Sequence, residues 1–333
     1  MRVLIQGPGA IGRLLTARLA LAEIEVGLLD HDPKRAKQLR REGISLMQES
    51  REHRASVKVL CGGTAVSKSN GPRHGSATHG MMEADLLVVC VKAYDVARAI
   101  PSGVRYLRKE GLLLVLSNGL GNLETAQLHW PRGQCLGGTI TYGALREGMT
   151  GVRCTGDGRI RIGADVKETG EAFSGGERSA EVAQLFQSAG LHTEVVEDIQ
   201  QVIWEKVAIN CAINPVAALL GVENGQLPKS AAFPVAEHAA EEAAAVSVAA
   251  GVGLPVDGWG AHIEEVCETT PHNRCSMLVD LENRRRTEID ELNGRVAVWG
   301  GRLGVATPVN LTLTRLVKAV ESLSPLAPRR EEA

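Results

Sequence analysis

The hydrophobic pattern of this 333-residue chain changes near residue 197. Before that point, short apolar or β-branched runs alternate with longer segments in which apolar positions recur at helical spacing. This alternation is typical of an open, mostly parallel sheet flanked by helices. After that point, apolar positions recur only at helical spacing. We therefore predict an α/β domain over residues 1–197, an all-α domain over residues 198–326 and a frayed, charged tail over residues 327–333.

The predicted strands of the first domain are its apolar runs. They cover residues 2–6, 25–30, 85–91, 111–116, 137–143, 159–163 and 193–196. Between residues 35 and 60 the pattern predicts one helix, which ends at Gly43, and two more strands. Residues 62–80 and 167–179 are rich in glycine and polar side chains and lack periodicity, so we predict loops there, the second followed by a helix that ends at Ala189.

A glycine turn separates the first predicted strand from the first helix, with the spacing G-x-G-x-x-G. In such a unit the first glycine allows the tight turn, the second lets a pyrophosphate approach the backbone, and the third lets helix and strand pack closely. The amino terminus of the helix then faces the phosphates. The turn predicts a Rossmann-type domain in which the cofactor contacts Gly7, Gly9, Ala10, Ile11 and Gly12.

The second predicted strand ends at Asp30, where such domains bind the adenosine ribose. A carboxylate there can accept a hydrogen bond from the 2′-hydroxyl of NAD but repels the 2′-phosphate of NADP. His31, Lys34 and Arg35 follow at once, and these cations could neutralise a phosphate if Asp30 turns aside. We predict that Asp30 and His31 contact the cofactor, and the choice between NAD and NADP stays open.

Two polar residues stand after the most apolar runs of the first domain. Lys92 follows residues 85–91, and Asn118 follows residues 111–116. Ligands of open α/β sheets bind at the carboxyl ends of the strands, so both side chains are predicted at the cofactor crevice. The alternative for Asn118 and Gly119 is a simple turn.

The first predicted helix of the second domain carries a row of polar side chains. Lys206, Asn210 and Asn214 are four residues apart, so each is rotated by only about 40° from the last and all three share one face. The other sides of residues 204–214 are apolar or small. An ammonium and two carboxamides can together bind a carbonyl oxygen and a carboxylate, whereas the alternative is an ordinary solvated lysine.

The other predicted helices of the second domain include a second polar cluster. These helices cover residues 217–220, 235–250, 261–269, 276–298 and 311–322. Residues 273–294 combine Ser276 with several arginines and acids, among them Glu288. The plain interpretation is one long charged helix whose side chains pair at four-residue spacing, with Ser276 as its cap.

The composition narrows the class of protein. A formal net charge of -2 gives no basic excess for nucleic acid, and seven scattered cysteines without a C-x-x-C suit reduced thiols in the cytoplasm. From the sequence we expect no apolar run long enough to span a bilayer, and neither a membrane nor a nucleic-acid partner. His74 and His79 lack acidic or thiol neighbours, so we expect no metal site.

Together these motifs resemble the ketopantoate reductase (2-dehydropantoate 2-reductase) family over nearly the whole chain. The matching motifs, in the order of that family, are Gly-x-Gly-x-x-Gly at 7–12, Val-Lys-Ala-Tyr at 91–94, Asn-Gly at 118–119, Trp-x-Lys-x-x-x-Asn-x-x-x-Asn at 204–214, Ser-Met at 276–277, Thr-Glu-Ile-Asp at 287–290 and Asn-Gly at 293–294. The resemblance implies a Rossmann domain joined to a helical domain, and reduction of a branched 2-oxo acid by NADPH on the route to pantothenate.

The resemblance also implies roles for individual residues. Lys206 matches the general acid and Glu288 the essential carboxylate, which also contacts the cofactor. The residues that match substrate contacts are Asn210, Asn214, Ser276 and Asn118, of which Asn118 also lies near the nicotinamide. The chain departs from the family at three places: Cys275 replaces a common first serine, Asp30 with His31 replaces the usual arginine for the 2′-phosphate, and Cys154 replaces a common histidine.

Two other functions remain open at this stage. The same lysine and carboxylate would serve a reductase of another small branched 2-oxo acid. A dinucleotide-binding sensor without turnover would need neither. The alanine-rich helices of the second domain could bury a two-fold interface, so we expect a homodimer.

Overall fold

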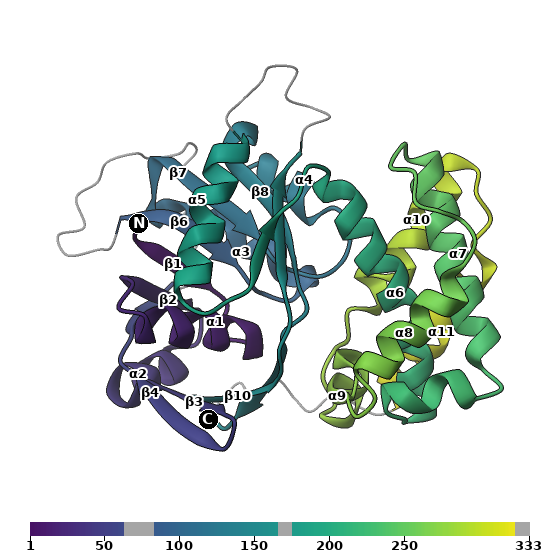
Figure 1. Cartoon of the computed structure of the whole chain (residues 1–333), viewed down its shortest axis with the longest axis horizontal. Coiled ribbons are helices and arrows are strands. Elements are labelled where there is room, and N and C mark those ends of the chain that lie inside the picture. The colour runs from purple at the N-terminus through teal and green to yellow at the C-terminus, as the bar shows by residue number, and fades with distance from the viewer. Residues whose placement is uncertain (63–82, 166–174, 324–333) are drawn as a thin grey trace. The chain divides into compact units, whose positions relative to one another are not determined.

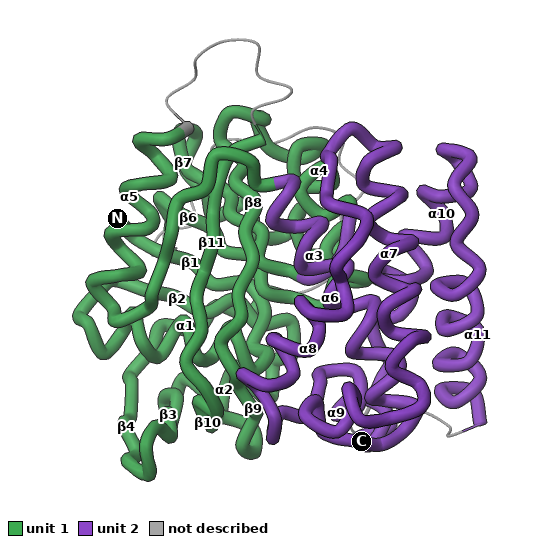
Figure 2. The backbone as a smooth tube through the Cα atoms, turned by 45° about the vertical axis from the view of Figure 1, so that its right-hand side comes forward, with its two compact units in different colours: residues 1–117, 121–199 green, residues 118–120, 200–333 purple. Residues whose placement is uncertain are grey.

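The computed structural model describes residues 1–62, 83–165 and 175–323, which form two compact units. One contains residues 1–117 and 121–199, and the other contains residues 118–120 and 200–333 (Figure 2). Each unit is considered separately. Most of the predicted loop 62–80, with His74 and His79, lies outside the described residues, as do residues 167–174 and the tail 327–333.

The α/β unit is built on an eight-stranded sheet (Figure 1). In sheet order its strands are β12 (Thr193–Val195), β11 (Ile160–Ala164), β8 (Cys135–Ile140), β7 (Leu107–Val115), β6 (Ala84–Val89), β1 (Val3–Gln6), β2 (Val26–Asp30) and β5 (Lys58–Cys61). All neighbours pair in parallel except β8 with β11, which are antiparallel. The predicted α/β fold class with its parallel sheet is confirmed.

A second, four-stranded sheet was not predicted. Its order is β4 (Arg51–Ala55), β3 (Ile44–Gln48), β10 (Gly151–Gly156) and β9 (Gly143–Glu147). The two strands predicted between residues 35 and 60 are therefore three, because β4 also forms there. Four of the five residues of β4 are exposed, so the strand carries almost none of the apolar signal that marks a buried strand.

Five helices and the small sheet accompany the large sheet. The helices are α1 (Ala10–Leu21), α2 (Pro33–Glu42), α3 (Val96–Gly103), α4 (Asn122–Gln127) and α5 (Gly175–Ser188), with single turns at Ala93–Asp95, Val104–Tyr106 and Arg132–Gln134. Gly43 ends α2 at φ 71°, as predicted. The predicted loop 167–179 is wrong at its end, because α5 begins at Gly175, where two glycines occupy the first turn.

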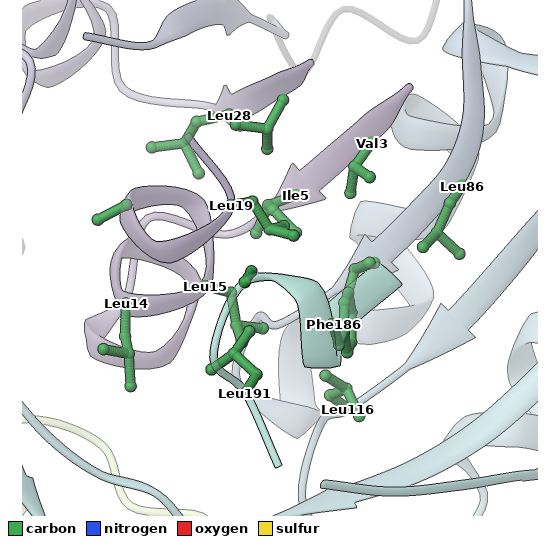
Figure 3. Close-up of a cluster of buried hydrophobic side chains, with 14 of the residues drawn as sticks. Val3, Ile5, Leu14, Leu15, Leu19, Leu28, Leu86, Leu116, Phe186 and Leu191 are labelled. Atoms are coloured by element: carbon green, nitrogen blue, oxygen red, sulfur yellow. The ribbon is translucent and has the colours of Figure 1, made fainter. Parts of the chain in front are cut away.

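The core of this unit forms around α1. Leu14, Leu15 and Leu19 of this helix are fully buried, and they belong to one cluster with Val3 and Ile5 of β1 (Figure 3). Helix α1 contacts β1 and β2 and also contacts β3, β9 and β10 of the small sheet. Helix α1 therefore packs against both sheets, and burial of these leucines, at about 25 cal/mol per Å², stabilises its position.

The second unit is helical. Its helices are α6 (Ile199–Leu220), α7 (Phe233–Ala249), α8 (Trp259–Thr269), α9 (Ser276–Glu282), α10 (Asn293–Leu303) and α11 (Pro308–Leu323), with short turns at Asn224–Lys229 and Ile289–Glu291. Five alanines of α7 are fully buried and allow close helix packing: Ala236, Ala239, Ala240, Ala243 and Ala244. Trp204 and Trp299 meet edge to face with ring centroids 6.1 Å apart.

The predicted helix 276–298 is wrong in its middle. Helix α9 ends at Glu282, and Arg284 adopts φ 52°. The N–H of Arg284 donates to the carbonyl of Leu281, and the N–H of Arg285 donates to that of Asp280. These two bonds form a Schellman motif, which normally has glycine at the left-handed position and so escaped detection.

Helix α6 spans residues that the sequence analysis divided into two helices, and it contains Pro215. Among the described residues it is the one helix whose length and mean hydropathy of 1.3 would suffice to cross a membrane, contrary to the expectation that no such stretch exists. Within the structure 67% of that window is buried, as in the core helix of a helical unit.

Candidate functional site

The three glycines of the turn meet different surroundings. Gly7 has φ 112°, and a Cβ there would lie 2.9 Å from the backbone of Cys90 and Val91. A Cβ on Gly12 would lie 1.8 Å from the carbonyl oxygen of Gly7. A Cβ on Gly9 would meet only the carbonyl oxygen of Cys90, at 4.0 Å. The protein itself therefore requires the first and third glycines, and it leaves space beside the second for the pyrophosphate of a dinucleotide.

The amino terminus of α1 is suited to bind an anion. Gly9 is its N-cap, no side chain caps the first turn, and no acidic residue lies there. Ala10 and Ile11 begin the helix and are half-buried. The N–H groups and the positive end of the helix dipole can therefore serve the phosphates. Lys92 is half-buried. It lies two residues after Cys90, whose carbonyl oxygen faces Gly9.

Asp30 is fully buried and already paired. Its two carboxylate oxygens accept from Nη2 and Nε of Arg35 at 2.6 and 2.7 Å, and one of them also accepts from the N–H of Asp32 at 2.9 Å. The side chain of His31 is 67% exposed, with Nδ1 3.9 Å from Asp30. Asp30 has thus turned toward Arg35, which neutralises its charge.

A buried arginine that the sequence analysis missed stands beside this pair. Arg13 is 1% exposed, and its Nη1 donates to the carbonyls of Gly148 and Gly151 at 3.1 and 2.9 Å. The pKa of Arg13 is lowered to about 10, chiefly by burial and also by nearby Arg146 and Arg35, whereas Asp30 raises it. The signal in the sequence was an arginine directly after the third glycine, a place where burial is otherwise expected.

The polar row of α6 is embedded in packed side chains. Lys206 and Asn210 are half-buried, and Asn214 is 7% exposed. The remaining sides of the same turns are buried, namely Trp204, Val207, Ala208, Cys211 and Ala212. The row is therefore not a solvated stripe, because its three side chains extend from a helix whose other sides are packed in the core.

Glu288 is brought together with Asn118, 170 residues away. The carboxylate is 5% exposed, and Asn118 Nδ2 donates to its Oε2 at 3.3 Å. Residues 118–120 belong to the helical unit, where Leu120 is buried in the core. Gly119 has φ 93°, and a Cβ there would lie 2.5 Å from the carbonyl oxygen of Glu291. The segment that carries Asn118 is therefore packed against the segment of Glu288 and is not a simple turn.

Cys275, and not Ser276, caps the amino terminus of α9. Ser276 is exposed as the first residue of α9, whereas Cys275 is the N-cap, its sulfur accepting from the N–H of Leu278 at 3.4 Å. The prediction of Ser276 as the cap is wrong. The Cys275 thiol also donates to the carbonyl of Asn214 at 3.5 Å, which joins α9 to the polar row. Burial raises the pKa of Cys275 to about 11, so the thiol stays neutral.

Comparison with known proteins assigns both halves of the chain. The profile described as ketopantoate reductase PanE/ApbA matches residues 3–167, and the profile of its C-terminal domain matches residues 198–321. The chain belongs to the ketopantoate reductase family. The family predicted from the motifs is thereby confirmed.

Individual relatives match over almost their full length. The 2-dehydropantoate 2-reductase of Halobacterium salinarum is 34% identical, with 96% of this chain and 99% of the relative covered. The enzyme of the same name from Archaeoglobus fulgidus is 33% identical, with 96% and 98% covered. The ketopantoate reductase fold is thus present here as a whole.

Solved structures share this fold. A PanE/ApbA family ketopantoate reductase from Ralstonia eutropha has a TM-score of 0.81 at 29% identity, with 97% of this chain and 99% of that chain covered. A D-mandelate dehydrogenase with NADH and anilino(oxo)acetate has a TM-score of 0.86 at 24% identity, with the same coverage. In the part of the chain that the structure describes, no three His, Cys, Asp or Glu side chains gather into a metal-binding group.

Proposed function

We propose that this protein reduces 2-dehydropantoate to (R)-pantoate with a nicotinamide cofactor, a step of pantothenate biosynthesis. Family membership and relatives named for this reaction support the proposal. The observation that carries it is the pairing of Asn118 with the buried carboxylate of Glu288, in the same unit as the lysine row of α6. A protein that only binds a dinucleotide would gain nothing from a buried carboxylate held in this way, since burial of a charge is costly.

Lys206 is assigned as the general acid. The reduced nicotinamide, when bound, supplies a hydride to the keto carbon. The Lys206 ammonium stabilises the negative charge that develops on the carbonyl oxygen and donates the proton that completes the hydroxyl group. Neutral lysine remains and regains its proton from solvent. Glu288 orients the ammonium and accepts a hydrogen bond from the substrate hydroxyl.

The amides and Ser276 are assigned to the substrate. Asn210, Asn214 and Ser276 can donate to the carboxylate of the 2-oxo acid. Asn118 supplies a further amide donor to the substrate. All four side chains are themselves uncharged donors, which suits a substrate carboxylate. Holding the carboxylate fixes the keto carbon within about 3 to 3.5 Å of the hydride, which lowers the entropic part of the barrier.

The glycine turn and the residues after β2 are assigned to the cofactor. The pyrophosphate is assigned to the turn, namely to Gly7, Gly9, Ala10, Ile11 and Gly12. Lys92 is assigned to the cofactor beside this turn. Asn118 and Glu288 are assigned as contacts of the nicotinamide.

The pairing of Asp30 bears on cofactor choice. Its carboxylate is neutralised by Arg35, and Arg13 and Arg146 add positive charge to the surroundings. We therefore assign NADPH as the preferred cofactor and NADH as an alternative, because Asp30 stands where such domains bind the adenosine ribose. Arg35 takes the place of the strand-end arginine that binds the 2′-phosphate in the family.

A homodimer in the cytoplasm completes the proposal. Large apolar side chains on the last two helices of the helical unit are exposed, among them Val298 at 47%, Leu311 at 40% and Leu316 at 48%. Burial of such side chains between two copies is a common basis of two-fold assembly. Light scattering of the purified protein tests this assignment, and a monomer at micromolar concentration would contradict it.

A steady-state assay tests the function. Purified protein is mixed with 2-dehydropantoate and either NADPH or NADH, beside a Lys206→Ala variant. We expect turnover that the variant loses. Turnover with other 2-oxo acids only, such as the one that corresponds to D-mandelate, would instead favour a reductase of different specificity. Binding of NADPH without turnover of any oxo acid would favour a sensor.

A further inference from the structure

Helix α6 carries its site residues across a proline. Pro215 lies inside the helix and has no N–H, so the carbonyl of Cys211, four residues earlier, loses its normal helical partner. Cys211 is fully buried. A buried carbonyl without a partner costs free energy, so the fold must supply a donor from elsewhere.

The donor is the side chain of Asn293, the first residue of α10. Asn293 is fully buried, and its Nδ2 donates to the carbonyl of Cys211 at 3.0 Å and to Oδ1 of Asn310 at 3.0 Å. Asn310 in turn donates from its own Nδ2 to Glu242 Oε2 at 2.7 Å and to the carbonyl of Ala239 at 2.9 Å. The helices α6, α7, α10 and α11 are therefore joined by one chain of hydrogen bonds.

The direction of this chain is forced by its two ends. The carboxylate of Glu242 and the carbonyl of Cys211 can only accept, so each asparagine must turn its NH₂ group toward them. Glu242 is itself fixed, because its two oxygens also accept from the N–H groups of Val309 and Asn310 at 2.8 and 2.9 Å. These N–H groups belong to the first turn of α11, where a negative charge is favourable.

The supported carbonyl lies within the polar row. Cys211 directly follows Asn210, and Pro215 directly follows Asn214. A proline ring pushes against the carbonyl four residues earlier and changes the course of the helix at that turn. The direction in which Asn214 points, relative to Lys206 and Asn210, therefore depends on the proline and on the donor that receives the displaced carbonyl.

We propose that Asn293 and Pro215 are positioning residues, which together set the spacing of the Asn210 and Asn214 amides around the substrate. This inference rests on the proposed function, in which the row binds the carboxylate of a 2-oxo acid. Asn293 contacts neither substrate nor cofactor in this assignment. It acts through the carbonyl of Cys211.

Three variants test the inference: Pro215→Ala, Asn293→Ala and the double variant. Alanine at 215 restores an N–H for Cys211, so the melting temperature of Pro215→Ala should equal or exceed that of the wild type. Its kcat/KM should nevertheless fall roughly tenfold or more, chiefly through a higher KM for the oxo acid, because the amides have moved. The KM for NADPH should stay unchanged.

Asn293→Ala should lower both the melting temperature and kcat/KM, because two buried acceptors lose their donor. In the double variant the carbonyl of Cys211 regains a partner within the helix. The loss in melting temperature should therefore be smaller than the sum of the single effects, while kcat/KM stays low. Stability that returns without catalysis is the result that a merely structural role would not give.

Ser247→Ala is the matched control. Ser247 is a fully buried polar residue of α7 that donates to the carbonyl of Ala244 and accepts from the N–H of Leu254. It should lower the melting temperature and leave the KM for the oxo acid unchanged. A Pro215→Ala enzyme with the wild-type kcat/KM would overturn the inference alone, whereas a wild type without oxo-acid turnover would overturn the proposed function.

Discussion

Asn118 Nδ2 lies 3.3 Å from Glu288 Oε2, and both residues belong to the helical unit although 170 positions separate them. Thr287 helps to hold the acid in place, because its N–H donates to Glu321 of α11 at 2.7 Å. The N–H groups of Glu291 and Leu292 both donate to the carbonyl of Glu288 at 3.0 Å. The backbone on both sides of the Glu288 side chain is thereby held by hydrogen bonds.

The first prediction concerns this pair. Glu288→Gln keeps the size of the side chain but removes the charge that orients Lys206 in the proposed mechanism, so kcat should fall by about 10² to 10³. Asn118→Ala should cost less. If the two side chains act as a unit, the double variant will be no worse than Glu288→Gln alone. Additive losses in steady-state kinetics would show that the contact between them has no part in catalysis.

The second prediction uses two neighbouring glycines with nearly the same backbone conformation. Gly119 and Gly121 have φ of 93° and 85°, so alanine at either position costs about 1 to 2 kcal/mol. Only at Gly119 would the new Cβ meet the protein, at 2.5 Å from the carbonyl oxygen of Glu291, whereas nothing lies within 4 Å at Gly121.

The close approach should therefore separate the two variants. We expect Gly119→Ala to lose about 1 to 3 kcal/mol more than Gly121→Ala in urea unfolding. It should also lower kcat, because the clash moves the segment that carries Asn118. Equal stability of the two variants would mean that residues 118–120 do not pack on the Glu288 segment in solution.

Much of this site follows from sequence because helix geometry is local. Residues four apart share a face whatever the tertiary structure, so the row from Lys206 to Asn214 could be predicted from spacing alone. The continuous apolar run before Lys92 also predicted β6 locally, because a strand buried on both faces is apolar at nearly every position. Sheet pairing is not local, and the small sheet with its exposed β4 left too weak a pattern to detect.

Other features depend on partners that only the fold brings together. The motif at Arg284 gives no signal because a non-glycine residue occupies its left-handed position. Arg13 directly follows the third glycine, but its acceptors, the carbonyls of Gly148 and Gly151, are 135 and 138 residues away and are brought near only by the fold. Asn293 follows Cys211 by 82 residues, so its hydrogen bond cannot be derived from spacing.

The third prediction concerns pH. Burial raises the pKa of Cys135 to about 12 and that of Cys275 to about 11. An exposed thiol in the unfolded chain ionises near pH ~8.5, so these groups favour the folded state below that pH. Their contribution should be lost as pH rises through the folded values of about 11 and 12.

Urea unfolding under reducing conditions, repeated from about pH 8 to about pH 11, measures this loss in the free energy of unfolding. A Cys135→Ala variant is the control, because it should show a smaller decline in the free energy of unfolding with pH. A wild-type and variant decline of equal slope would show that ionisation of Cys135 is not part of the effect.

The last prediction concerns cofactor choice. Arg35 holds both oxygens of Asp30, so Arg35→Ala would leave a bare carboxylate facing the 2′-phosphate. The kcat/KM with NADPH should fall by roughly tenfold or more, while that with NADH changes little, since the free carboxylate can accept from the ribose hydroxyls.

Lys37→Ala is the matched control: Lys37 is exposed on the same helix, and its loss removes the same charge without uncovering Asp30. Asp30→Ala should act in the opposite direction, because it frees Arg35 for the phosphate. If Arg35→Ala and Lys37→Ala lower NADPH use equally, only the general positive field matters and the Asp30 to Arg35 pair does not determine the preference.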